Sequence, residues 1–242
     1  MSTFQSKLLA VAQMNSATKN LIDENTASQF HTLCSHMLKV NETLNLTAIK
    51  DEDGVILKHI VDSLACTPYI EEGARVCDIG CGGGFPTLVI GILRRGVSVL
   101  GVDSVTKKVG YVKDTATLLG LDNVSVSNRR AEEMGQDKAL RESFDVATAR
   151  AVGKLNLICE LCLPLVKVGG KFLAMKSLST EEELKEAKNA IKILGGEVED
   201  VKNYTLTNGT ETIDRTIIII KKISKTPAQY PRNNSQIAKK PL

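Results

Sequence analysis

Asp78-Ile79-Gly80-Cys81-Gly82-Gly83-Gly84-Phe85-Pro86 is the most informative stretch of this sequence. It follows a strand pattern at Arg75–Ile79 and opens a helical pattern that begins at Phe85. Glycines at a strand-to-helix turn let the backbone approach a ligand closely, and the helix N-terminus presents free N–H groups. The loop therefore predicts a small-molecule site at the carboxyl end of a strand.

Strand and helix patterns alternate around this loop. The predicted strands are Arg75–Ile79, Val97–Val102, Val124–Ser127, Asp145–Thr148 and Lys171–Lys176. The predicted helices are Phe85–Arg94, Thr106–Leu119, Leu155–Val166 and Thr180–Leu194. This alternation predicts an α/β fold, with a mostly parallel sheet, helices on both faces and right-handed crossovers.

The pattern changes after this alternating region. Glu197–Leu206 and Arg215–Ile223 are two further predicted strands, joined by Thr207-Asn208-Gly209. Asn-Gly favours a tight hairpin turn, so these strands should pair antiparallel. A Rossmann-like parallel sheet that ends in such a hairpin is typical of class I S-adenosylmethionine methyltransferases, although the fold alone fixes no substrate.

The first part of the chain has a helical pattern without strands. Apolar residues recur at helical spacing in Ala27–Leu44 and again in Asp51–Ala65. We therefore expect three parts: an N-terminal helical extension (1–70), a methyltransferase core (71–223) and a basic C-terminal tail (224–242).

Two cofactors compete for the glycine loop. The dinucleotide fingerprint Gly-x-Gly-x-x-Gly needs its third glycine where Phe85 or Thr87 stands, which argues against a dehydrogenase. The observed spacing, Asp-x-Gly-x-Gly-x-Gly, resembles the S-adenosylmethionine loop of methyltransferases. Asp78 is compatible with the cationic sulfonium of that ligand and would be a poor neighbour for a pyrophosphate. We expect Asp78, Gly80 and Gly82 to contact S-adenosylmethionine.

Acidic residues after the next two predicted strands could complete this cofactor site. Asp103 ends the second strand, 23 residues after Gly80, where a carboxylate can accept both ribose hydroxyls. The alternative is a helix cap before the helix that starts at Thr106. Glu132 and its neighbour Ala131 follow the third strand and could contact the adenine, or Glu132 could stabilise a helix N-terminus.

The fourth predicted strand ends at Arg150, where methyltransferases of this class place residues that face the substrate. This region lacks the Asn/Asp-Pro-Pro-aromatic tetrad that accompanies amine methylation, and the chain has no Pro-Cys pair for cytosine carbon methylation. Guanine N7 needs neither, because its lone pair is already exposed, so positioning and electrostatics suffice. Arg150 could hold the cofactor carboxylate, guanine O6 or a phosphate; the alternative is a structural ion pair.

The charge of the chain is unevenly distributed. Net charge is +3, yet residues 221–242 carry six Lys and Arg side chains and no acid. Such a basic end predicts contact with a polyanion; the alternative is a solvated tail.

The N-terminus has no signal-peptide pattern, so we expect a cytoplasmic protein. Cys159 and Cys162 lack a second pair of zinc ligands and fit small apolar positions on a helix, so we expect no metal.

Several short blocks together resemble one known family. The blocks are Asn45-Leu46-Thr47-Ala48-Ile49, His59-Ile60-Val61-Asp62-Ser63-Leu64, Asp78 through Pro86, Arg130-Ala131-Glu132, Ala149-Arg150-Ala151, Gly169-Gly170, Ala174-Met175-Lys176, Tyr230-Pro231-Arg232 and Lys239-Lys240-Pro241-Leu242. Their order and content are similar to the bacterial 16S rRNA guanine-N7 methyltransferase G family, also called glucose-inhibited division protein B. The chain departs from the family in having no tryptophan and a tail poorer in arginine and glycine.

This resemblance implies an S-adenosylmethionine cofactor and a guanine N7 target in 16S rRNA or the small ribosomal subunit. It implies cofactor contacts at Gly80, Phe85, Ala131, Glu132 and Arg150. We expect RNA contacts at five positions: His59, Lys176, Arg232, Lys239 and Lys240. For His59 a structural pair with Asp62, three residues on, is the alternative. We expect a monomer with no membrane partner; the rival functions are a small-molecule methyltransferase and a non-catalytic RNA-binding assembly factor.

Overall fold

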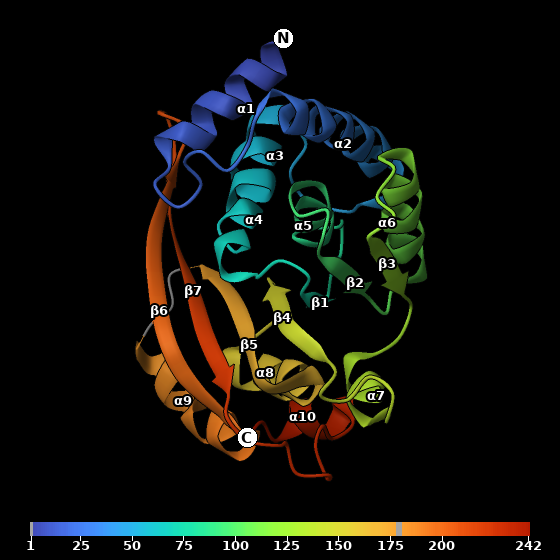
Figure 1. Cartoon of the computed structure of the whole chain (residues 1–242), viewed down its shortest axis with the longest axis vertical. Coiled ribbons are helices and arrows are strands. Elements are labelled where there is room, and N and C mark those ends of the chain that lie inside the picture. The colour runs from blue at the N-terminus through green and yellow to red at the C-terminus, as the bar shows by residue number, and fades with distance from the viewer. Residues whose placement is uncertain (1, 178–180) are drawn as a thin grey trace.

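Seven strands form one sheet in the computed structural model of the chain, which describes residues 2–177 and 181–242. The strands are β1 (Arg75–Ile79), β2 (Ser98–Val102), β3 (Val124–Ser127), β4 (Phe144–Arg150), β5 (Val166–Ser177), β6 (Gly196–Thr207) and β7 (Thr212–Lys222). Their order is β3-β2-β1-β4-β5-β7-β6 (Figure 1). The first five strands pair in parallel, and β7 lies antiparallel between β5 and β6. The predicted fold class is confirmed.

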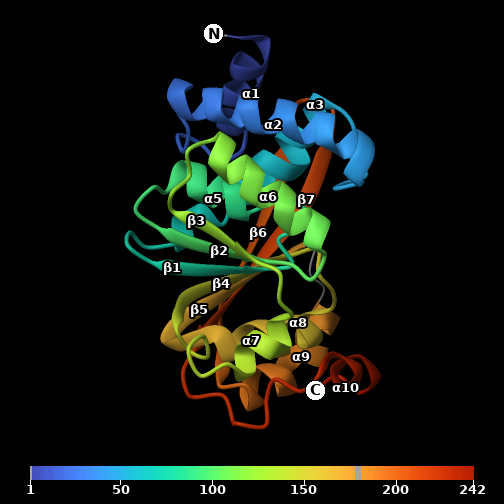
Figure 2. The same cartoon turned by 90° about the vertical axis from the view of Figure 1, so that its right-hand side faces the viewer.

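Helices cover both faces of this sheet (Figure 2). On one side lie α1 (Thr3–Met14), α2 (Glu24–Leu44), α3 (Glu52–Val55), a π-helix (Ile56–Val61), α4 (Asp62–Leu64), α5 (Thr87–Leu93) and α6 (Thr106–Leu118). On the other lie α7 (Ala131–Gln136), α8 (Leu155–Cys162), α9 (Glu181–Ile193) and α10 (Asn234–Lys239). The first set shares one hydrophobic cluster and the second set another.

The central strands are buried on both faces, as a covered parallel sheet requires. In β1 every residue after Arg75 is buried. The isoleucine run 217–220 lies in β7, where Ile217 and Ile219 join one cluster and Ile218 and Ile220 join the other. No helix in the described residues is long and apolar enough to cross a membrane.

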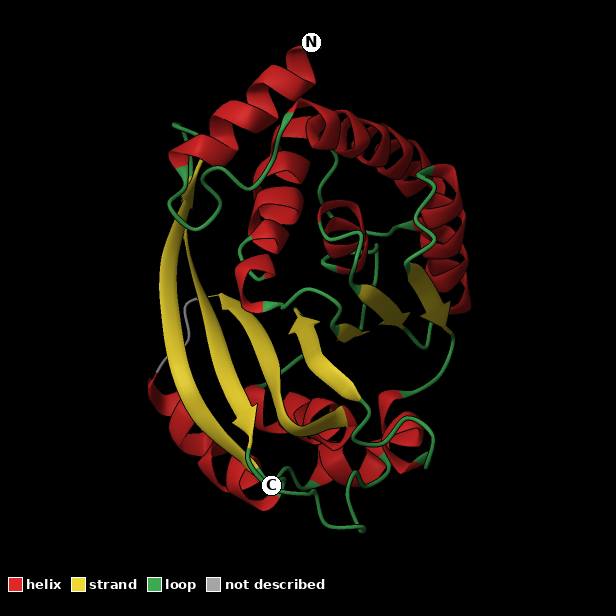
Figure 3. Cartoon of the chain, in the orientation of Figure 1, coloured by secondary structure: helices red, strands yellow, loops and turns green. Residues whose placement is uncertain are grey.

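The N-terminal helices do not form a separate body. Phe30 and Leu33 of α2 are fully buried in the cluster that also holds Leu88 of α5 and Val112 of α6. Helix α2 begins where the Asp23 side chain accepts a hydrogen bond from the backbone N–H of Thr26, a typical N-cap. Residues before 70 therefore share one hydrophobic core with the helices α5 and α6 on the same face of the sheet (Figure 3).

The C-terminal hairpin agrees with the sequence pattern. Strands β6 and β7 pair from Gly196 opposite Lys222 to Thr207 opposite Thr212. In the turn, the Asn208 carboxamide oxygen accepts backbone hydrogen bonds from Thr210 and Glu211. The predicted hairpin is therefore confirmed, and its turn spans residues 208–211, since Thr207 still belongs to β6 and β7 already begins at Thr212.

Other boundaries differ from the sequence pattern. The helix predicted for Leu155–Val166 ends at Cys162, because Leu163–Leu165 forms a 3-10 turn around Pro164 and Val166 already belongs to β5. The helix predicted from Phe85 begins only at Thr87, because residues up to Pro86 still belong to the glycine loop. Helix α9 begins at Glu181, and the predicted start at Thr180 lies outside the described residues.

The C-terminal tail is packed against the protein body. The Arg141 guanidinium donates hydrogen bonds to the backbone oxygens of Thr226, Pro227 and Tyr230. Ile237 of α10 is fully buried in the cluster under the sheet. The alternative of a freely solvated tail is therefore wrong for this segment, because backbone and apolar contacts hold it.

Two of the six cations counted at this end are paired with buried or half-buried carboxylates. Lys222 is fully buried, lies 3.3 Å from a Glu142 carboxylate oxygen, and burial lowers its pKa to about 8. Arg232 donates two side-chain hydrogen bonds, of 2.8 and 2.6 Å, to the fully buried carboxylate of Glu160. Their charges are therefore largely compensated within the fold.

Replacing Arg232 with alanine should destabilise the protein, because Glu160 would remain buried without its cation. We expect Arg232→Ala to lower the free energy of unfolding by about 3 kcal/mol, the lower end for a broken buried pair. Lys154→Ala is the matched control, because the Lys154–Glu186 pair is exposed on both sides and should contribute less than about 1 kcal/mol. Urea unfolding of both variants measures this, and equal effects would contradict the structural role of Arg232.

Candidate cofactor and substrate site

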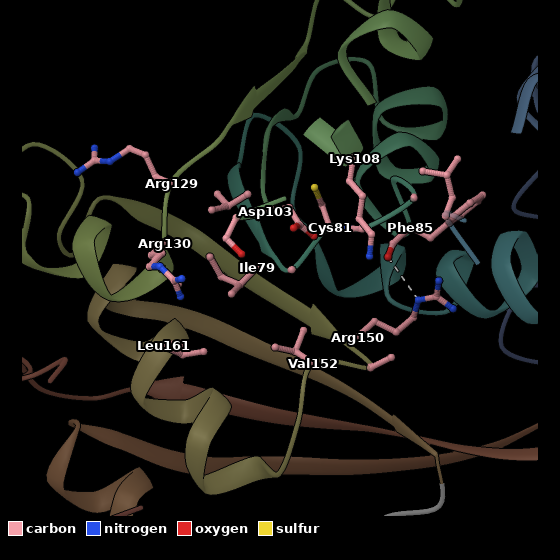
Figure 4. A pocket seen from close by; sticks show the side chains of 18 of the residues that line it. Ile79, Cys81, Phe85, Asp103, Lys108, Arg129, Arg130, Arg150, Val152 and Leu161 are labelled. Carbon is pink, nitrogen blue, oxygen red and sulfur yellow. Dashed lines mark hydrogen bonds between the residues drawn. The ribbon is translucent and has the colours of Figure 1, made fainter. Parts of the chain in front are cut away.

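A cavity of about 490 Å³ lies at the carboxyl ends of β1 to β4. Its lining combines the glycine loop, the residues that follow β2, β3 and β4, and residues from α2 and the segment after it. Figure 4 shows Arg150 and Phe85 toward one end, with Arg129, Arg130 and Leu161 toward the other. This is the position at which open parallel sheets bind ligands.

Glycine is required in the loop that forms the cavity floor. Gly80 has a φ of +73°, and a Cβ there would lie 2.7 Å from a methyl carbon of Val152. The backbone N–H groups of Gly80 and Cys81 donate to the Val102 carbonyl oxygen at 2.8 and 3.0 Å. The loop is therefore fastened to the end of β2 and leaves space above it for a ligand.

Asp78 supports the loop from below, and its position differs from the one expected. Its carboxylate is buried and accepts hydrogen bonds from the Thr87 hydroxyl at 2.6 Å and the Thr148 hydroxyl at 2.8 Å. It is not among the residues that line the cavity. Burial raises the pKa of Asp78 to about 6. The structure therefore places Asp78 behind the loop rather than in the cavity lining, so the lining does not support the direct cofactor contact predicted for it.

Asp103 lines the cavity at the end of β2. One carboxylate oxygen accepts the Gly82 backbone N–H at 3.0 Å, and the other accepts the Val105 N–H at 2.9 Å. Helix α6 has Val105 as its N-cap, without a capping side chain, so Asp103 does not cap the helix in the usual sense. Each oxygen retains a lone pair, so the carboxylate can accept further hydrogen bonds from a ligand.

The far end of the cavity is formed by residues that follow β3. Ala131 and Glu132 begin α7 and line the cavity, as do Arg130 and, from α8, Leu161. Asn234 of α10 also lines it, which brings the C-terminal segment to the cavity rim. With Arg129, this end therefore combines an apolar wall with one acidic side chain, two guanidinium groups and one amide.

Arg150 is held by several elements at the other end. Its Nη1 donates to the Lys58 carbonyl oxygen at 2.8 Å and to the Asp62 carboxylate at 3.1 Å. Its Nε donates to the Phe85 carbonyl oxygen at 3.4 Å (dashed in Figure 4), and its Nη2 lies 3.1 Å from His59 Nδ1. Four of its five N–H groups thus have partners among the described residues, so Arg150 can offer one more hydrogen bond to a ligand.

His59 and Asp62 both contact Arg150, and no hydrogen bond or ion pair among the described residues joins them directly, so the alternative of an isolated His59–Asp62 pair is replaced by a cluster around Arg150. Residues Ile56–Val61 form a π-helix, whose wider turn changes which side chains are neighbours. The His59 ring stacks on Phe85 at 4.7 Å between centroids and lines the cavity. Burial, together with the nearby charge of Arg150, lowers the pKa of His59 to about 3, so its ring is neutral.

The other predicted RNA-contacting residues lie away from the cavity lining. Lys176 pairs with Glu183 at 2.6 Å and donates to the Gly153 carbonyl oxygen at 2.7 Å. Lys239 and Lys240 are exposed at the end of α10. The structure therefore gathers Gly80, Gly82, Phe85, Asp103, Ala131, Glu132, Arg150 and His59 around one cavity, and leaves Lys176, Arg232, Lys239 and Lys240 outside its lining.

Sequence patterns missed several lining residues. Thr47, Lys108 and Asn234 were not among the predicted cofactor contacts, yet each lines the cavity. Thr47 lies in one of the blocks that carry the family resemblance, so that block was the available signal. Cys159 and Cys162 are both buried in α8, in agreement with small apolar positions.

The fold and the cavity define a class I methyltransferase architecture. A family model described as rRNA small subunit methyltransferase G matches residues 26–213. The chain therefore belongs to the rRNA small subunit methyltransferase G family.

Individual relatives agree with this membership. Ribosomal RNA small subunit methyltransferase G of Lactobacillus delbrueckii subsp. bulgaricus is 45% identical over 220 residues, covering 88% of this chain and 90% of its own. The protein of that name from Geobacillus kaustophilus is 43% identical over 224 residues, covering 92% and 93%. The solved structure of M. jannaschii TYW2 in complex with AdoMet has a TM-score of 0.51 and 14% identity, and covers 67% of this chain and 77% of that one, which is a likeness of fold.

Removing the Asp103 carboxylate should weaken cofactor binding while the fold survives. We expect Asp103→Ala to cost about 1.5–3 kcal/mol of binding free energy, the range for hydrogen bonds to a charged group. Asp114→Ala, on an exposed turn of α6, is the control and should bind S-adenosylmethionine as the wild type does. Calorimetric titration measures both affinities, and an unchanged affinity in folded Asp103→Ala would remove this residue from the site.

Proposed function

We propose that this protein transfers a methyl group from S-adenosylmethionine to N7 of a guanine in 16S ribosomal RNA. The observation that carries the proposal is the cavity, in which the glycine loop contacts Asp103 through Gly82 and the Arg150 cluster through Phe85. Membership of an rRNA methyltransferase family supports the RNA substrate. We further propose that the protein acts as a monomer in the bacterial cytoplasm, where its substrate would be found.

The residues of the cavity suit the parts of this cofactor. Asp103 would accept the ribose hydroxyls through its free lone pairs, and Ala131 and Glu132 would contact the adenine. The Gly80 turn would allow the methionine part to lie against the backbone. The cavity volume of about 490 Å³ is within the range of small-molecule sites. When bound, S-adenosylmethionine supplies an electrophilic methyl group on a sulfonium.

The protein needs to provide alignment more than acid-base chemistry. Guanine N7 attacks with its own lone pair and loses no proton, so no general base is required. His59 is neutral and Arg150 is anchored by Asp62, so neither must exchange a proton during the reaction. A rigid pocket that holds the purine in line with the methyl group is then the main contribution of these side chains.

The exposed cations of the C-terminal segment would bind phosphate. Lys225, Lys239 and Lys240 are exposed, whereas Lys222 and Arg232 are compensated by carboxylates. Since Asn234 begins α10 and lines the cavity, Lys239 and Lys240 at the other end of this short helix extend from near the rim of the site, whereas Lys225 follows β7 at the opposite edge of the sheet. Electrostatic attraction at this rim would orient RNA toward the cavity.

The methylated product is the direct test. N7-methylguanine carries a fixed positive charge, so mild borohydride followed by aniline cleaves RNA beside it. We expect rRNA or small subunits from a deletion strain, incubated with enzyme and cofactor, to show one new break by primer extension. Methyl incorporation without a break would contradict the N7 assignment alone. If no methyl group is incorporated into RNA or subunits, RNA is ruled out as the substrate, and the alternative of a small-molecule methyltransferase is favoured.

Removing two tail lysines should weaken RNA binding without affecting the cofactor. We expect Lys239→Gln with Lys240→Gln to make the slope of log affinity against log salt shallower by about 1.5, because two phosphate contacts are lost. Lys185→Gln with Lys188→Gln, on the exposed side of α9, is the matched control. Filter binding across a salt series measures the slopes; equal slopes for the two double variants would mean that the tail lysines do not contact RNA.

A further inference from the structure

The hydrogen bonds around Arg150 fix the direction of a short relay that leads into the cavity. Arg150 Nη2 lies 3.1 Å from His59 Nδ1. A guanidinium has only donors, so Nδ1 must accept and cannot carry a proton. The direction of this first bond therefore determines the tautomer of the ring.

The neutral His59 ring accepts a hydrogen bond at one nitrogen and donates one to Thr47 from the other. Burial and the Arg150 charge keep the pKa of His59 at about 3, so the ring carries one proton, and that proton is on Nε2. His59 Nε2 lies 2.9 Å from Thr47 Oγ1 and therefore donates to it. Thr47 Oγ1 also accepts the backbone N–H of Ile49 at 3.2 Å.

The Thr47 hydroxyl is left with one function. A hydroxyl oxygen has two lone pairs and one hydrogen. Both lone pairs are used by His59 and Ile49, and none of the residues that the structure describes accepts the hydrogen. Because Thr47 lines the cavity, its hydrogen is available to a ligand there. The relay therefore turns Thr47 into a fixed donor.

We propose that the Thr47 hydroxyl binds O6 of the target guanine and so selects guanine over adenine. This inference rests on the proposed function. The Hoogsteen edge of guanine presents N7 and O6, both acceptors, whereas adenine presents an amino group beside N7. N7 must face the methyl donor, so O6 is the acceptor that remains for recognition. A fixed donor can form a hydrogen bond with O6 of guanine. Opposite adenine it would face the amino group, which is also a donor, so no hydrogen bond could form.

Thr47 lies away from the residues proposed for the ribose and adenine of the cofactor. Thr47 is joined through His59 to Arg150 and Phe85, which lie at one end of the cavity in Figure 4. The residues proposed for ribose and adenine, Asp103 and Ala131, follow β2 and β3 instead. Thr47 also comes from the segment between α2 and α3, outside the sheet that carries the glycine loop.

Thr47→Val tests the donor, because valine keeps the shape of threonine and removes the hydroxyl. We expect kcat/KM for methylation of rRNA from a deletion strain to fall about five- to tenfold, as for one lost hydrogen bond. The affinity for S-adenosylmethionine, measured by calorimetry, should not change. Thr47→Ser should recover most of the loss, since serine restores the donor. Thr43→Val, an exposed position on α2, is the matched control and should behave as the wild type.

The outcomes separate this inference from the proposed function. If the wild-type protein methylates rRNA and Thr47→Val does so equally well, the inference is overturned and the proposed function stands. A weaker cofactor affinity in Thr47→Val would assign the donor to the cofactor carboxylate and overturn the guanine contact. Absence of N7 methylation by the wild-type protein would sink the proposed function and the guanine contact together.

The relay has a test that needs no activity. The chain has three histidines, so the ring nitrogens of His59 can be assigned by ¹⁵N-histidine labelling and comparison with His59→Gln. Proton–nitrogen correlation spectra should show a protonated Nε2 and an unprotonated Nδ1 near neutral pH. A protonated Nδ1 would reverse the direction of the relay and overturn the donor role of Thr47.

Discussion

The buried carboxylate of Asp78 is the interaction on which the site depends. It lies at the end of β1 and binds Thr87 at the start of α5 and Thr148 in β4. One side chain thereby fixes the glycine loop, the helix behind it and the neighbouring strand. Burial disfavours its charge, whereas the two hydroxyls and the Thr87 N–H favour it. Three hydrogen bonds thus hold this carboxylate in place beneath the cavity floor.

A second buried carboxylate connects the sheet to the N-terminal helices. Asp62 of α4 accepts hydrogen bonds from Arg150 of β4 and Tyr204 of β6, and it pairs with Arg215 of β7. Two arginines around one carboxylate leave the cluster positive, which suits a site that must approach an oxygen-rich or anionic ligand. The N-terminal helices are thus part of the site, since they carry the acid that aligns Arg150.

The sequence predicted the sheet, its hairpin and most of the cavity, because those features depend on local patterns. Apolar alternation located β1 and β3 to the residue, and glycine spacing located the loop. Helices α7 and α10 were missed because six residues are too few to display a helical period. The site residues that were missed, such as Thr47 and Asn234, reach the cavity through tertiary packing, which no local pattern encodes. Asp78 was assigned to the ligand for a similar reason: its charge was visible in the sequence, whereas its two threonine partners were not.

The packing of the C-terminal tail fixes where its positive charges lie on the protein surface. A free basic segment would bind phosphate wherever it met one, whereas a segment fixed by Arg141 and by the Arg232–Glu160 pair presents Lys239 and Lys240 at one place. That place adjoins the cavity, because Asn234 lies between Arg232 and Lys239 and lines the rim. Glu160 would be an unpaired buried charge without Arg232, so the fold itself maintains this arrangement. The same ion pair that stabilises the protein therefore sets the distance between the exposed lysines and the cavity.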